Sequence, residues 1–228
     1  FIMHQIVQRL IRIQDQIKEE DSKNHTPNDT KIIAICKTFP LDVIMPLIEY
    51  GHLHFGENKI QEAKIKWTNI KKARPEINLH FVGKLQTNKA KDVVKLFDYV
   101  HSLESIKQAE ALVKYENKFK KKLKYFVQIN IGGETQKSGI DLKDVKNFLE
   151  TCKNNYDLNI IGLMCLPPDS QFPEKYFKKM LDLKTALLTS YQHQVNELSI
   201  GMSNDYIKAI QCRSTFLRIG TKIFGERN

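Results

Sequence analysis

Short apolar runs alternate with longer amphipathic stretches along this chain of 228 residues. Each apolar run has the length of a β-strand and is bounded by turn residues, whereas the stretches between runs carry apolar residues at helical spacing. The pattern predicts eight strands, within 31–39, 52–55, 79–82, 99–103, 124–131, 159–166, 197–203 and 214–220. It predicts helices at about 4–20, 41–50, 59–72, 88–96, from 105, 142–152, 173–190 and 204–211.

The regular alternation indicates a parallel sheet, because strands that are joined by crossover helices run in the same direction. Eight βα units in a chain of this length favour a closed (β/α)₈ TIM barrel, with the helix at 4–20 as an addition that covers one side. An open doubly wound sheet is the alternative. Its dinucleotide-binding form would carry GxGxxG after the first strand, where this chain reads CKTFP. We therefore expect a single domain overall, with an N-terminal helix and connector at 1–30 and a barrel at 31–228.

Composition places the chain among ordinary globular proteins, since 41% of its residues are hydrophobic and 27% are charged. No apolar run approaches the roughly 18 residues that a membrane span requires, and the amphipathic N-terminal stretch lacks the cleavage site of a signal peptide. The cysteines, at positions 36, 152, 165 and 212, form no CxxC motif and no zinc-ligand spacing with histidines. We expect reduced thiols in a cytoplasmic protein that binds neither metal nor membrane.

The net charge of +10 favours anionic partners, either polyanions or phosphorylated small molecules. Much of the surplus lies in the segment KYENKFKKKLK at 114–124, where lysines near a helix end complement the helix dipole and stay solvated. An RNA-binding strand would interleave aromatic with basic residues, and the sequence contains no such element. Charge alone does not choose between these partners, but nucleic acid has no further support.

A single lysine, Lys37, follows the most apolar strand. Residues 32–35 are apolar on both faces, which is typical of a strand in a parallel sheet that helices cover. Lys37 therefore stands at the carboxyl end of a buried strand, and in parallel α/β folds that end carries the chemistry. A lysine that only extends its ammonium into solvent is the alternative interpretation.

Further polar residues follow other strands of the predicted barrel, whose carboxyl ends share one mouth. They are Glu57 and Asn58 after strand two, Lys84 and Gln86 after strand three, Ser203 and Asn204 after strand seven, and Gly220 and Thr221 after strand eight. Barrels commonly bind phosphate with the loops after strands seven and eight, through backbone N–H groups at a helix start. The matching loops here read GMSND and RIGTK.

Several of these residues also have purely structural interpretations. Ser203 and Asn58 are both suited to capping the helix that follows them, and Gly220 is suited to a tight turn after a strand. Arg218, near the end of an apolar strand, requires an anionic or hydrogen-bonding partner. An ion pair inside the protein would supply one.

A lysine amine and a phosphate site at one mouth indicate a phosphorylated aldehyde that is held as a Schiff base. Pyridoxal 5'-phosphate is the common ligand that has both groups. The amine must lose its proton before it can attack a carbonyl carbon, and partial burial beside positive groups such as Arg218 favours that loss. An aldolase that forms an imine with a sugar phosphate is an alternative, although Glu57 is the only obvious acid/base carboxylate at the mouth.

Eight segments of the chain match, in order, those of a known family. They are AICKTFP, HFGENKIQE, LHFVGKLQTNK, HSLES, QINIGGETQKSGI, IIGLMCLPP, LSIGMSNDYIKAI and STFLRIGTKIFGER. Over residues 31–227 the chain thus resembles the YggS/PROSC family of pyridoxal phosphate homeostasis proteins. The resemblance implies a barrel like that of alanine racemase and of the eukaryotic-type ornithine decarboxylases, which is fold type III of the pyridoxal phosphate proteins.

The resemblance also implies roles for individual residues. The positions that match the family's cofactor site are Lys37, Asn58, His80, Ser203, Arg218, Gly220 and Thr221. Lys37 would anchor the cofactor, and Arg218 would face its ring nitrogen or its phosphate. The serine, the glycine and the threonine of the set would bind the phosphate, and the histidine would lie near the site. One departure is Arg213, which stands where the family has a glycine just past a helix end.

The implied function is pyridoxal phosphate binding for intracellular homeostasis of that cofactor, with a Schiff base on Lys37 and little or no catalysis. We expect a monomer that passes its cofactor to pyridoxal-phosphate-dependent apoenzymes. An amino-acid racemase or decarboxylase of the same fold type is the rival function. Such enzymes carry a second, β-rich domain that contributes catalytic residues, whereas this chain stops eight residues after Gly220.

Overall fold

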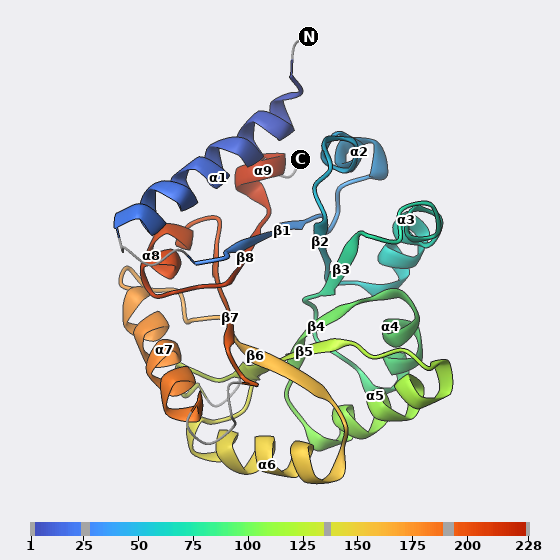
Figure 1. Cartoon of the computed structure of the whole chain (residues 1–228), viewed down its shortest axis with the longest axis vertical. Coiled ribbons are helices and arrows are strands. Elements are labelled where there is room, and N and C mark those ends of the chain that lie inside the picture. The colour runs from blue at the N-terminus through green and yellow to red at the C-terminus, as the bar shows by residue number, and fades with distance from the viewer. Residues whose placement is uncertain (1–2, 24–27, 135–137, 189–193, 227–228) are drawn as a thin grey trace.

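The computed structural model describes residues 3–23, 28–134, 138–188 and 194–226. Parallel strands form a closed barrel in chain order, and β8 pairs with β1 to complete it (Figure 1). The strands are β1 Lys31–Ile35, β2 His54–Glu57, β3 Asn78–Phe81, β4 Tyr99–Leu103, β5 Lys124–Ile129, β6 Asn159–Cys165, β7 Glu197–Met202 and β8 Phe216–Ile219. The predicted (β/α)₈ barrel is confirmed, and the open doubly wound sheet is excluded.

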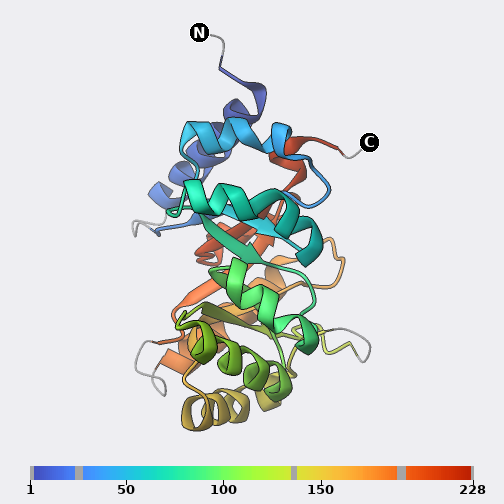
Figure 2. The same cartoon turned by 90° about the vertical axis from the view of Figure 1, so that its right-hand side faces the viewer.

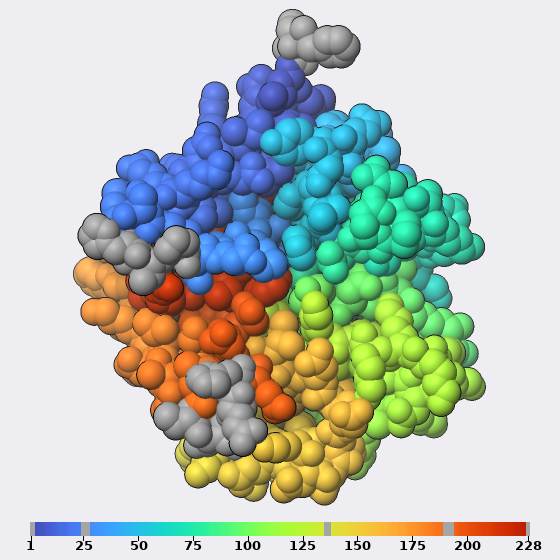
Figure 3. Space-filling model, viewed as in Figure 1, coloured from blue at the N-terminus to red at the C-terminus, as the bar shows by residue number. Residues whose placement is uncertain are grey.

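Helices surround the barrel and follow one another around its outside, as the colours of Figures 1 and 3 show. They are α1 Gln5–Lys23, α2 Leu41–Tyr50, α3 Ile60–Ala73, α4 Ala90–Leu96, α5 Ile106–Phe119, α6 Val145–Asn155, α7 Glu174–Leu188, α8 Tyr206–Gln211 and α9 Thr221–Phe224. The 3-10 turns η1 Thr87–Lys89 and η2 Leu142–Asp144 precede α4 and α6. Among the described residues, none of these helices combines the length and the apolar character that a membrane crossing requires.

The apolar side chains form two layers, because successive residues of a strand point to opposite faces of the sheet. The inner layer fills the barrel and consists of Ile33, Ile35, Tyr99, Phe126, Met164 and Phe216. The outer layer lies between the strands and the helices, and its largest buried side chains include Trp67 and Phe177. Strand β1 is apolar on both faces at residues 32–35 for this reason, as the sequence pattern predicted.

The N-terminal helix α1 lies against α2, α8 and α9 (Figures 1 and 2). Its buried residues are Ile6, Val7, Leu10, Ile13 and Ile17. Side-chain hydrogen bonds add to this apolar contact. Arg9 Nη1 donates to the Ile223 carbonyl at 3.3 Å, and the Tyr206 hydroxyl donates to Gln16 Oε1. The helix therefore braces the two short helices that follow the last two strands.

Several element boundaries differ from the predictions. Strand β1 ends at Ile35, because the chain then turns: Thr38 has a φ of 71° and the Phe39 N–H donates to the Cys36 carbonyl at 3.1 Å. Helix α8 begins at Tyr206 rather than at 204. Helix α9, only four residues long, was not predicted at all.

Arg213, where the sequence comparison above leads us to expect a glycine, adopts the left-handed backbone conformation that glycine adopts easily. Its φ is 63°, and its N–H donates to the Ile210 carbonyl at 2.8 Å just after α8 ends at Gln211. The helix thus stops where a glycine would stop it, but with an unfavourable contact between the Arg213 Cβ and its own backbone.

We expect Arg213→Gly to raise the free energy of unfolding by about 1 kcal/mol, because a non-glycine residue in this conformation costs roughly 1–2 kcal/mol. Urea denaturation at equilibrium measures the change. Arg213→Ala is the control, since it removes the guanidinium but keeps the Cβ. A glycine variant no more stable than the alanine variant would contradict the assignment.

Candidate functional site

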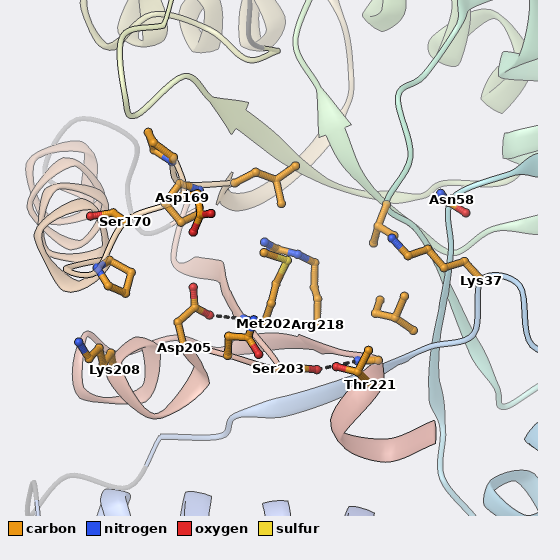
Figure 4. A pocket seen from close by; sticks show the side chains of 18 of the residues that line it. Lys37, Asn58, Asp169, Ser170, Met202, Ser203, Asp205, Lys208, Arg218 and Thr221 are labelled. Atoms are coloured by element: carbon orange, nitrogen blue, oxygen red, sulfur yellow. Dashed lines mark hydrogen bonds between the residues drawn. The ribbon is translucent and has the colours of Figure 1, made fainter. Parts of the chain in front are cut away.

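A cavity of about 650 Å³ opens at the carboxyl ends of the strands (Figure 4). The loops after β1, β2, β3, β6, β7 and β8 supply its walls. The predicted site residues that line it are Lys37, Asn58, Ser203, Arg218, Gly220 and Thr221. His80, the seventh predicted residue, does not line it.

Lys37 reaches from the loop after β1 into this cavity (Figure 4). Its side chain is half-buried and extends into the cavity from the side of β1. Gly220 lies close to the same loop, since a Cβ on Gly220 would be 3.6 Å from the Ile35 carbonyl oxygen. The first and last strands thus bring a lysine amine and the start of α9 to one cavity.

Ser203 joins the loops after β7 and β8. Its hydroxyl accepts the backbone N–H groups of Gly220 and Lys222, both at 3.3 Å. The residue before α8 is Asp205, so Ser203 does not cap the helix that follows it. The N–H groups that Ser203 accepts belong to the first turn of α9, and such N–H groups are suitable donors to a phosphate oxygen.

Asn58 does not cap α3 either, since the residue before that helix is Lys59. Its side-chain oxygen is buried and accepts no hydrogen bond from any described residue. The Gly83 backbone packs closely against the Asn58 backbone, since a Cβ on Gly83 would lie 2.1 Å from the Asn58 carbonyl oxygen. A buried amide oxygen without a donor beside a cavity is consistent with a ligand that supplies one.

Arg218 is buried but forms no ion pair with a carboxylate of the described residues. Its Nη1 donates to the carbonyl and to the Oγ of Ser199, both at 2.6 Å, and its Nη2 donates to the Cys165 carbonyl at 2.9 Å. Burial lowers the pKa of the guanidinium from its ordinary value, although arginine keeps its charge in proteins. Neutral dipoles therefore hold this cation at the wall of the cavity.

His80 lies inside the barrel, in a chain of hydrogen bonds that leads to Arg218. His54 Nδ1 is 3.0 Å from His80 Nε2, and His80 Nδ1 is 2.9 Å from His101 Nε2. His101 Nδ1 is 2.8 Å from Ser199 Oγ, to which Arg218 donates. Within the described residues, this hydrogen-bond chain connects His80 with Arg218 through His101 and Ser199.

The chain of histidines is uncharged. Burial lowers the pKa values of His80 and His101 well below 6.5, and it lowers the pKa of His54 to about 4. Because Arg218 donates to Ser199 Oγ, the serine proton is left for His101 Nδ1. His101 and His80 then carry their own protons on Nε2, and each donates to the next histidine, His101 to His80 and His80 to His54.

The prediction that Glu57 lies at the mouth was wrong. Glu57 is fully buried, and its Oε1 lies 3.0 Å from Trp67 Nε1 and 2.6 Å from Lys66 Nζ. It points towards α3 because side chains alternate between the two faces of a strand. Lys84 and Gln86 also lie outside this cavity and line neighbouring ones.

One wall of the cavity, formed by the loop between β6 and α7, was not predicted from the sequence. The lining residues of this loop are Leu166, Pro167, Pro168, Asp169, Ser170, Gln171 and Pro173. The signal that could have found it is the pair of prolines directly after a strand that ends at the mouth. In the described part of the chain, no group of three or more His, Cys, Asp or Glu side chains is arranged to hold a metal ion.

Comparison with known proteins identifies the family. Residues 10–228 match the family model of the alanine racemase N-terminal domain. A pyridoxal phosphate homeostasis protein of Vibrio alginolyticus is 34% identical to this chain, over 99% of the chain and 99% of the relative. This chain belongs to the pyridoxal phosphate homeostasis protein family.

Solved structures agree with this family assignment. PipY of Synechococcus elongatus, solved with pyridoxal phosphate bound, has 29% identity and a TM-score of 0.85, covering 97% of this chain and all (100%) of PipY. An alanine racemase of Clostridium difficile has 15% identity and a TM-score of 0.66 over 93% of this chain and 57% of the racemase. At this identity the racemase is similar to this chain in fold only. The chain therefore has the barrel fold of alanine racemase, as predicted.

We expect the free energy of unfolding to fall as the pH is lowered from about 7 to about 5. The pKa values of His52, His54, His80 and His101 are all lower in the folded protein than the ordinary 6.5. Below about pH 6.5 the unfolded chain therefore binds protons that the folded chain excludes. The free energy of unfolding falls by up to about 1.4 kcal/mol per pH unit for each histidine.

Urea denaturation across this pH range measures the slope. His101→Asn, which cannot titrate, should make the slope shallower than in the unaltered protein. Equal slopes would mean that His101 does not contribute as a buried neutral group.

Proposed function

We propose that this protein binds pyridoxal 5'-phosphate in the cavity, holds it as a Schiff base on Lys37, and serves intracellular homeostasis of the cofactor with little or no catalysis. The observation that carries the proposal is that one cavity contains a lysine amine together with the hydroxyl and backbone donors of the β7 and β8 loops. The names of the relatives and the PipY structure with bound cofactor support it.

Each end of the cavity would bind a different part of the ligand. Ser203, Gly220 and Thr221 would bind the phosphate, and Asn58 would accept a donor from the ring or its substituents. When bound, pyridoxal phosphate supplies an aldehyde next to an aromatic ring. The Lys37 amine would add to the aldehyde carbon, forming a C–N bond while the carbonyl oxygen leaves as water.

Weak catalysis follows from the positive charge of Arg218 and from the groups that the cavity lacks. A guanidinium against the ring nitrogen would disfavour protonation of that nitrogen, and a protonated ring is what withdraws electrons from a carbanion. A racemase also needs a base on each face of the reacting carbon. No Tyr, His or Cys lines the cavity within the described residues. The carboxylates that line it are Asp169, on the loop after β6, and Asp205, which already accepts the Met202 N–H at 2.6 Å.

The proposal extends to the setting in which the protein works. We propose a cytoplasmic monomer that passes the cofactor to apoenzymes, with residues 1–30 and 31–228 in one domain. The packing of α1 against α8 and α9 supports the single domain. The buried, unpaired state of all four cysteines supports a reducing compartment.

Lys37→Ala should abolish the covalent adduct and leave the fold intact, because Lys37 points into the cavity rather than into the core. Borohydride reduction of the protein mixed with pyridoxal phosphate, followed by peptide mapping, locates the adduct. Lys208→Ala is the control, since Lys208 also lines the cavity but pairs with Glu174 at its edge. An adduct on a lysine other than Lys37 in the unaltered protein would exclude the assignment.

The loaded protein should racemise or decarboxylate no common amino acid at a substantial rate, while its cofactor should restore activity to an added apoenzyme. Product assays with each amino acid, and activation of a pyridoxal-phosphate-dependent apoenzyme, test the two halves. Turnover of about 1 per second or faster, lost in Lys37→Ala, would favour the rival racemase or decarboxylase function.

A further inference from the structure

A buried ammonium lies beneath the loop that carries Lys37. Lys66, on α3, is only 8% exposed. Its Nζ donates to the Cys36 carbonyl at 2.8 Å and to the Phe39 carbonyl at 3.1 Å. These two carbonyls lie on either side of Lys37 in the chain, so a single side chain of α3 binds the loop before and after the anchor lysine.

Two carboxylates complete the arrangement. Glu57 Oε1 lies 2.6 Å and Glu62 Oε1 lies 2.8 Å from Lys66 Nζ. Glu62 Oε1 also accepts the backbone N–H of Thr38 at 2.6 Å. The Lys66 ammonium thus contacts two acids while it holds the loop, and one of those acids, Glu62, holds the loop as well.

The conformation of Thr38 explains why the loop needs these contacts. Its φ of 71° lies in the left-handed region, which a β-branched residue such as threonine rarely adopts. Such a conformation persists only where surrounding contacts impose it, and it is typical of functional sites. The contacts that impose it here come from Glu62 and Lys66, and the residue they leave facing the cavity is Lys37.

A simple internal ion pair would not require this geometry. An ammonium that served only to neutralise Glu57 could donate its other hydrogen bonds to any acceptor on α3 or to water. Instead, the Lys66 protons are directed to the two loop carbonyls as well as to the acids. The arrangement therefore acts on the backbone of residues 36–39, beyond balancing charge.

We propose that Glu62 and Lys66 are positioning residues, which hold the turn at residues 36–39 so that the Lys37 amine already points into the cavity when the aldehyde arrives. The inference rests on the proposed function, because it concerns the rate at which Lys37 becomes linked to that aldehyde. Positioning of this kind matters because a misplacement of about 1 Å can slow a reaction about 100-fold.

Glu62 is the better residue to alter, since removal of Lys66 would leave the Glu57 carboxylate buried without a counter-charge and risk unfolding. Glu62→Ala removes the acceptor of the Thr38 N–H. Glu62→Gln keeps an oxygen that can accept it. Lys64→Ala, on the same helix, removes an exposed lysine that pairs with Asp92 on α4, and it is the matched control.

Two measurements are needed on each variant of the full chain. The first is the hydrogen exchange rate of the Thr38 amide in protein without cofactor, followed by NMR. The second is the rate at which the covalent adduct forms after mixing with pyridoxal phosphate, followed by visible absorption. We expect Glu62→Ala to speed the exchange and to slow adduct formation about 10- to 100-fold, with Glu62→Gln and Lys64→Ala both close to the unaltered protein.

The outcomes separate the inference from the proposed function. Adduct formation at the unaltered rate in Glu62→Ala would overturn the positioning role, whether or not the Thr38 amide exchanges faster. A Glu62→Gln variant as slow as Glu62→Ala would overturn the role assigned to the Thr38 hydrogen bond. If the unaltered protein itself forms no adduct at Lys37, it is the proposed function that fails, and this result is seen before any variant is compared.

Discussion

The pairing of β8 with β1 is the contact on which the cavity depends. It places Ile33 opposite Arg218 and Ala34 opposite Ile219, and so joins strands from the two ends of the chain. The loops that follow these strands then lie side by side, with Lys37 on one and Thr221 on the other. Because contacts between residues so far apart in sequence are costly to form, the cavity cannot exist before the barrel closes.

The interior of the barrel holds the positive charge of Arg218 at the wall of the cavity. Arg218 is held by carbonyl and hydroxyl dipoles, and the polar chain behind it continues through neutral histidines. Aromatic rings enclose that chain: His80 stacks on Tyr99 at 4.2 Å and His101 on Phe126 at 4.3 Å between ring centroids. In this apolar surrounding the charge of Arg218 is weakly screened, which favours an anionic ligand in the cavity beside it.

The features that the sequence predicts well are those set by repetition and by the ends of strands. Apolar runs such as 32–35 predict the barrel, and the place of Lys37 two residues after that run predicts its position at the mouth. The face on which a side chain lies is harder to predict, because Glu57 and Asn58 are adjacent yet point to opposite sides of the sheet. Local conformation is harder still, since tertiary contacts impose it on Thr38.

The positions of α1 and α3 have a mechanical consequence. Helix α3 holds the loop of Lys37, whereas α1 braces α8 and α9, the helices that begin beside the other end of the cavity. Each end is thus fastened to a different part of the molecule. A small molecule attached at both would act as a removable cross-link between the loop after β1 and the loops after β7 and β8, in addition to the pairing of β8 with β1. These loops would be stiffer when the ligand is bound, and release of the ligand would give each loop back its separate freedom to move.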